Sequence, residues 1–166
     1  LRKEDMELST GLADDFDGGI TQAYFGFREQ YQAMSGGSQD PMLILVLEGD
    51  SLDQPVEQAY ATGAAKQWQI QQNGQSISSA KDHNAHRFNM NSRAGQLVSK
   101  MIELVGKGDK SKGQEFFVTR GHYMTQAAFY QGLSFHWKRI QMPTVGGEMR
   151  DVLLPTVVIE GVVAKA

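Results

Sequence analysis

The sequence of 166 residues contains no cysteine. This absence excludes a disulfide framework and a zinc site built on thiolates. It fits a reducing compartment, so we expect a cytoplasmic location. No apolar run reaches the roughly 18 residues that span a bilayer, and we expect no membrane partner. Residues 1–5 do not open a signal peptide, because no apolar core follows their basic pair.

Recognisable catalytic patterns are also missing. There is no Gly-x-Ser-x-Gly elbow, and the basic, glycine-rich stretch 107–113 lacks the phosphate-binding loop pattern. The acids that come closest to a nuclease metal cluster are Glu48, Asp50 and Asp53, and a turn explains them better. We therefore expect no enzymatic activity and no cofactor.

Histidine is scarce, with four in the chain. His83 and His86 lie three residues apart in a predicted loop, and His122 and His136 follow downstream. Structural zinc sites usually recruit cysteine, so these positions do not predict a metal centre. The acidic cluster around Asp15 lacks the spacing of a calcium loop.

The charge that is present is unevenly distributed. Residues 1–60 hold 3 Lys/Arg and 12 Asp/Glu, whereas residues 81–139 hold 10 Lys/Arg and 4 Asp/Glu. Such asymmetry indicates either an anionic partner for the basic part or attraction between the two parts, within one fold or between subunits. Both explanations remain open from the sequence.

The length fits one domain, which we divide into an acidic N-terminal arm (1–19) and a β-rich body (20–166). Aromatic and β-branched residues predict a first strand over 20–30, followed by a glycine-rich loop over 34–41. The unbroken apolar run 42–47 predicts a central strand that is covered on both faces.

The middle of the chain predicts a hairpin and then the main helix. Extended residues 57–72 meet Asn73-Gly74, a strong turn signal, and 75–79 return. The helix covers 91–105 with Asn91 or Ser92 as its cap, because an apolar stripe at helical spacing follows and Gly106 ends it. After a loop over 107–113, residues 115–119 form a short strand or helix and 125–131 a short helix.

The C-terminal part predicts a hairpin of strands over 133–140 and 151–159. Pro155 indicates an edge position or a bulge in the second strand. Several strands around one main helix favour a mostly β fold, an OB-like, partly open Greek-key barrel. The alternative is a β-sandwich or jelly-roll with an inserted helix.

Basic side chains alternate with aromatic ones in the way that single-stranded DNA requires, since basic grooves track phosphates and exposed rings stack on bases. The predicted DNA-binding residues are Lys66, Trp68, Lys81, His86, Arg87, Arg93, Trp137, Lys138 and Arg139. Arg120 with Tyr123 is a further pair of this kind. The competing explanation is that the aromatic side chains are core and the charges a solvated face.

Three short patterns carry a resemblance over residues 85–160. They are Phe88-x-x-Asn91-Ser92-x-x-Gly95-x-Leu97-Val98, Gly132-Leu133-x-Phe135-His136-Trp137-x-Arg139 and Leu153-Leu154-Pro155. The chain resembles phage-encoded, OB-fold proteins of the single-stranded-DNA-binding type. Many single-stranded-DNA-binding proteins end in an acidic tail, whereas this chain carries its acid at the front.

The resemblance implies non-sequence-specific binding of single-stranded DNA in phage replication or recombination, in the host cytoplasm. The alternative is a phage virion structural protein, such as a capsid decoration or tail-interface subunit. A third hypothesis is an adaptor or inhibitor that engages a host protein through the acidic arm. A homo-oligomer and a replication or virion partner protein are compatible with these hypotheses.

Overall fold

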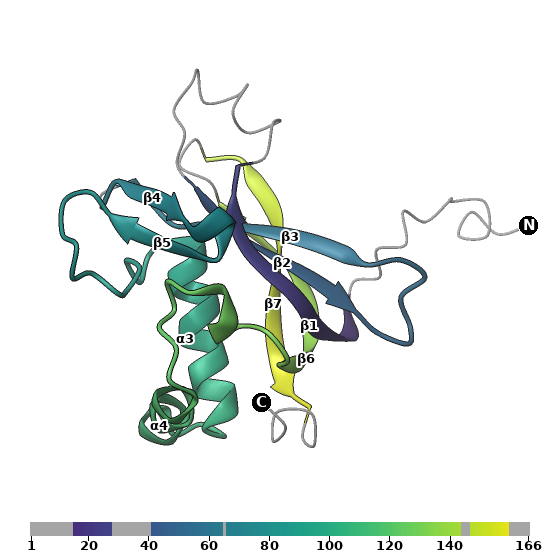
Figure 1. Cartoon of the computed structure of the whole chain (residues 1–166). Helices are drawn as coiled ribbons and strands as arrows, with labels where there is room; N and C mark the ends of the chain where they lie inside the picture. The colour runs from purple at the N-terminus through teal and green to yellow at the C-terminus, as the bar shows by residue number, and fades with distance from the viewer. Residues whose placement is uncertain (1–14, 28–40, 65, 144–146, 160–166) are drawn as a thin grey trace, which may run out of the picture.

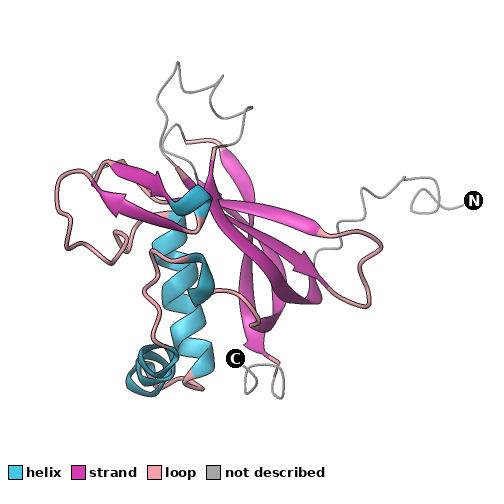
Figure 2. Ribbon diagram, viewed as in Figure 1, coloured by secondary structure: helices cyan, strands magenta, loops and turns pink. Residues whose placement is uncertain are grey.

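The computed structural model describes residues 15–27, 41–64, 66–143 and 147–159. This part of the chain is mostly β, with a five-stranded antiparallel sheet, a separate two-stranded hairpin and two α-helices (Figures 1 and 2). Neither of these α-helices is long and apolar enough to cross a membrane.

The large sheet has the strand order β3-β2-β1-β6-β7. Its strands are β1 (Asp15–Gly26), β2 (Met42–Glu48), β3 (Val56–Ala61), β6 (Ser134–Pro143) and β7 (Met149–Val158). Three consecutive strands lie side by side, and β6 returns after a long connection to pair with β1. This order is a Greek key.

Strand β1 pairs with a different partner in each part of its length. Its first part, Asp15–Gly19, pairs with β6, and its second part, from Gly19 to Gly26, pairs with β2 across a register shift after Ile20. The edge strands β3 and β7 approach across the core, where the Tyr60 hydroxyl donates to the Leu153 carbonyl at 2.6 Å. No ladder joins these edges in the described residues, so the sheet stays open.

One face of the sheet carries the core. Directly paired residues on this face include Phe16 with Trp137 and Leu43 with Tyr60, and all four are buried. Helix α3 (Arg93–Val105) contacts β7 and β3, and its apolar stripe Leu97, Val98 and Met101 is buried. The small hairpin of β4 (Trp68–Gln71) and β5 (Ser76–Ser79) contacts β1 through β5.

The prediction of α3 is confirmed, including its cap. The Ser92 hydroxyl accepts a hydrogen bond from the Gly95 backbone N–H at 2.9 Å, which satisfies one of the free donors of the first turn. The strands predicted at 42–47, 133–140 and 151–159 are also confirmed. Pro155 lies on the edge strand β7 at a register shift against β6, as its missing N–H requires.

A second helix, α4 (Lys110–Arg120), corrects the prediction of a loop over 107–113 with a short element after it. Asp109 starts this helix, since its carboxylate accepts from the Ser111 backbone N–H at 3.0 Å. Gly113 lies inside α4 rather than in a loop. A Cβ atom there would overlap the Ile102 carbonyl oxygen of α3, so the missing side chain lets the two helices pack closely.

The predicted start of the first strand is also wrong. Strand β1 begins at Asp15 rather than at residue 20, so residues 15–19 of the predicted acidic arm belong to the sheet. Exposed Asp15 and Asp17 alternate with buried Phe16 and Gly18, which is the period of a half-buried strand. The rest of the predicted arm, residues 1–14, lies outside the described residues, as do residues 28–40 of the predicted first strand and loop.

Candidate nucleic-acid interface

Both tryptophans of the predicted DNA-binding set lie in the core. Trp137 is 0% exposed, and its indole N–H donates to the Gly18 carbonyl at 2.9 Å. Trp68 is 4% exposed, and its ring meets the buried Phe88 ring edge-on at 5.8 Å between centroids. The prediction that Trp68 and Trp137 stack on bases is therefore wrong, because each ring faces the side of its strand that other elements cover.

Three predicted basic residues are separated by the fold. The Arg93 guanidinium donates to the Pro143 carbonyl and so ties the start of α3 to the end of β6. Arg139 lies on the core face of β6, with Nη2 buried and without a partner. Lys138 is exposed on the opposite face, paired across strands with Asp15. These three positions do not form one surface.

Arg139 also acts on a buried tyrosine. Burial raises the pKa of Tyr60 well above its ordinary value, and the nearby Arg139 charge lowers that pKa by a smaller amount. The neutral Tyr60 hydroxyl keeps its proton for the Leu153 carbonyl. Arg139 is therefore half-buried on the core face of β6, beside Tyr60, and does not share the exposed face that carries Lys138.

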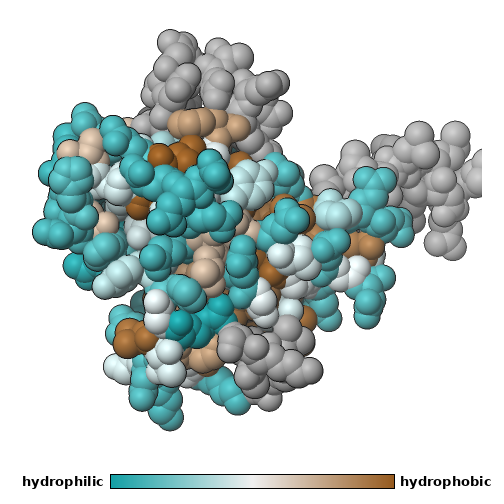
Figure 3. Space-filling view, in the orientation of Figure 1, coloured by the Kyte–Doolittle hydropathy of each residue, from teal (hydrophilic) through white to brown (hydrophobic). Residues whose placement is uncertain are grey.

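Lys66 and Lys81 come together at one end of the β4–β5 hairpin. The buried Ser79 hydroxyl donates to the Lys66 carbonyl at 2.6 Å and accepts from the backbone N–H groups of Lys81 (3.2 Å) and Asp82 (3.0 Å). This single hydroxyl fixes the backbone on both sides of the hairpin end. Hydrophilic residues cover most of the visible surface around the hairpin (Figure 3).

The loop after Lys81 continues the basic surface. The Asp82 carboxylate accepts from the Asn84 backbone N–H at 3.0 Å, which turns the chain so that His86 and Arg87 are exposed while the next residue is buried. Asp82 is the one acid between residues 66 and 91. We call this end of the hairpin, together with the loop that follows it, the basic end; it carries Lys66, Lys81, His83, His86 and Arg87.

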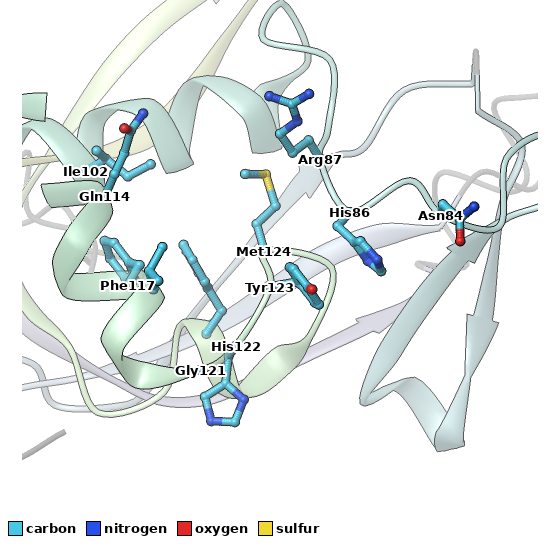
Figure 4. A pocket seen from close by; sticks show the side chains of 12 residues that line it. Asn84, His86, Arg87, Ile102, Gln114, Phe117, Gly121, His122, Tyr123 and Met124 are labelled. Carbon is cyan, nitrogen blue, oxygen red and sulfur yellow. The ribbon is translucent and has the colours of Figure 1, made fainter. Parts of the chain in front are cut away.

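An exposed aromatic pair borders the basic end. The His86 and Tyr123 rings stack with 3.9 Å between centroids and 8° between planes (Figure 4). Tyr123 is 54% exposed, and Gln126 fixes its backbone N–H through a 2.9 Å hydrogen bond. The sequence pattern paired Tyr123 with Arg120, but the predicted DNA-binding residues did not include Tyr123. Its position just after Gly121, which ends α4, was the available signal for exposure.

The Arg120 side chain makes contacts that hold the fold together. Its Nη2 donates to the carbonyls of Ala128 (3.2 Å) and Gln131 (2.9 Å), and its guanidinium lies over the Phe116 ring at 5.7 Å. Burial lowers its pKa below the ordinary value. Arg120 thus holds the end of α4 against the following segment and does not extend the basic end.

An open groove of about 660 Å³ runs beside the His86–Tyr123 stack. Residues from the 84–87 loop, α3, α4 and the 121–124 segment line it (Figure 4). Its apolar lining includes Ile102, Phe117 and Met124. The groove and the basic end therefore share His86 and Arg87.

The described residues contain no group of three or more His, Asp or Glu side chains that could hold a metal ion. On the outer sheet face, His136 Nδ1 lies 2.6 Å from Asp17 Oδ1, and His136 Nε2 lies 3.9 Å from Asp15 Oδ2. Comparisons of the chain with models of protein families, curated proteins and solved structures found no match. We therefore base the functional proposal on the geometry of the basic end and the groove.

Proposed function

We propose that this chain binds single-stranded DNA without sequence preference, through the basic end and the adjoining Tyr123 ring. The observation that carries the proposal is the exposed stack of Tyr123 on His86 beside Arg87. Cations along a path attract successive phosphates, and an exposed ring offers a face to any base. Lys66 and Lys81 extend the positive charge along the same end.

The strand connectivity supports this proposal. A β1-β2-β3 meander, a connecting helix and a final β6–β7 hairpin that returns beside β1 fit the OB type of partly open Greek-key barrel. The hydrogen bond from Tyr60 to Leu153 lies between the two strands that would close such a barrel. Because one fold hosts many functions, connectivity supports DNA binding only together with the basic end.

The resemblance to phage proteins leads to the biological setting. Two of its patterns include residues with clear structural roles, Ser92 as the cap of α3 and Pro155 in the shifted edge strand. We place the chain in phage DNA replication or recombination, in the host cytoplasm. This setting is part of the proposal and rests on the same binding activity.

A fluorescence-anisotropy titration with labelled oligothymidine at low salt tests the proposal. We expect saturable binding that an unlabelled single strand competes away. Tyr123→Leu should weaken it about fivefold or more, since stacking on one base contributes about 1–3 kcal/mol. Tyr123→Phe keeps the ring and should retain wild-type affinity. Absence of binding at low salt would rule out the proposal.

The virion hypothesis makes a different prediction. A capsid or tail subunit would form a defined ring or trimer in solution and would ignore DNA. Measurement of solution mass with and without oligothymidine separates the two hypotheses. The adaptor hypothesis assigns partner binding to the acidic arm (1–19). Because Asp15 and the residues after it belong to β1, the test removes residues 1–14, which should abolish partner binding while DNA binding persists.

A further inference from the structure

The groove beside the basic end has an apolar floor that DNA binding does not explain. Ile102, Phe117, Met124 and Phe129 come from two helices and two later segments to line it. A nucleobase brings polar edges, and each edge loses free energy when it is buried without a hydrogen-bond partner. Aliphatic and phenyl side chains offer no such partners. The floor suits apolar side chains better than bases.

One further apolar residue stands at the opening of this groove. Val118 of α4 is 77% exposed, which makes it the most exposed large hydrophobic residue in the described part of the chain. Tyr123, at 54%, lies at the same groove. Large apolar side chains gathered at one open site are typical of an interaction surface.

The formal charge in the groove lining is positive. It comes from Arg87, the lining includes no aspartate or glutamate, and His86 and His122 add ring nitrogens to it. The neutral amides Asn84 and Gln114 complete the polar part of the lining. Charge complementarity across an interface favours a partner that brings carboxylates to this rim.

We infer that the groove docks a short segment of a partner protein, with one or two large apolar side chains flanked by carboxylates. The apolar side chains enter the floor formed by Ile102, Phe117 and Met124, and the carboxylates meet Arg87 and the two histidines. A volume of about 660 Å³ holds a few side chains. This binding is an activity beyond DNA binding, and it uses the floor that DNA leaves free.

The test uses the full chain labelled with ¹⁵N and a synthetic peptide of a Leu-Phe pair flanked on each side by two aspartates. We expect saturable amide shifts at residues 84–87 and 114–124. One control peptide replaces the aspartates with lysines, and a second replaces Leu-Phe with serines. Both controls should lose the saturable shifts, because each removes one half of the recognition.

Two matched variants locate the peptide. Val118→Asp removes an apolar contact at the groove and adds a repelling charge, so affinity should fall about tenfold or more. Val157→Asp makes the same change on β7, at a residue that is 57% exposed and outside the groove lining, and should leave affinity unchanged. Amide spectra away from each substitution verify that both variants are folded.

Three results would overturn the inference. They are the absence of saturable shifts up to about 1 mM peptide, equal effects of the two variants, and saturation of the groove floor by oligothymidine in place of the peptide. The peptide titration contains no DNA, so it succeeds or fails independently of the DNA proposal. Conversely, Lys66→Gln with Lys81→Gln should weaken DNA binding and leave the peptide shifts intact.

Discussion

The pair of lysines at the hairpin end offers the sharpest test of the DNA surface. Replacement of Lys66 and Lys81 by glutamine removes two charges and keeps most of each aliphatic stem. The Ser79 hydroxyl fixes the backbone at both positions, so the two side chains start from neighbouring points. On the proposed surface each lysine neutralises one phosphate.

The size of the effect follows from counterion release. For single strands the slope of log affinity against log salt is about −0.7 for each neutralised phosphate. Loss of both contacts should make the slope shallower by about 1.4. For each tenfold decrease in salt, the wild type should then gain about 25-fold more affinity than the double variant.

Anisotropy titrations of oligothymidine over a series of salt concentrations measure this slope. Lys138→Gln is the matched control, because Lys138 is exposed on the other face of the sheet, opposite Asp15. We expect the control to keep the wild-type slope. An unchanged slope in the double variant, or an equal loss in Lys138→Gln, would refute the assignment of DNA to the basic end.

Three further predictions concern the fold. Burial raises the pKa of Tyr60 and Tyr130, so the folded state holds both neutral. The contribution of these neutral tyrosines to the free energy of unfolding is complete below the ordinary tyrosine pKa near 10. Above that pH the free energy of unfolding should fall by up to about 1.4 kcal/mol per pH unit for each tyrosine, and urea unfolding of Tyr60→Phe should show a smaller fall. Because Trp68 and Trp137 are buried, acrylamide should quench them weakly, and oligothymidine should leave that quenching unchanged; strong quenching that DNA suppresses would contradict their placement. Gly113→Ala forces a methyl group against the facing helix backbone and should cost roughly 1–3 kcal/mol, visible as a lower Tm, whereas an unchanged Tm would show that the helices can separate without cost.

The two helices show what a local sequence pattern can predict and what it cannot. Helix α3 was predictable because a cap at Ser92, an apolar stripe and a final Gly106 all lie within one segment. Helix α4 has no comparable stripe, and its buried residues are Gly113 and Phe117. It forms where Gly113 packs against α3, a contact that no local pattern records.

The candidate site was predictable only in part. Basic and aromatic residues alternate along the chain, but the alternation does not tell which ring faces water. The position of Trp137 beside Lys138 predicts a DNA-binding residue, but its side chain is fully buried. Tyr123 follows the end of a helix, and its side chain is exposed. Burial depends on what covers each face, and the covering elements come from elsewhere in the sequence.

By itself, the sequence determined the features that a few neighbouring residues encode: the strands at 42–47 and 133–140, the cap and stripe of α3, the edge position of Pro155, and the excess of positive charge over 81–139. Only the tertiary structure decided that Lys66 joins Lys81, that Tyr123 stacks on His86, and that Arg139 turns inward. The physical reason is the sequence distance over which each kind of interaction acts. Caps and periodicity act within one or two turns, whereas β1 pairs with residues of β6 that lie 115 to 123 positions further along the chain, and such pairings settle which side chains meet and which face water.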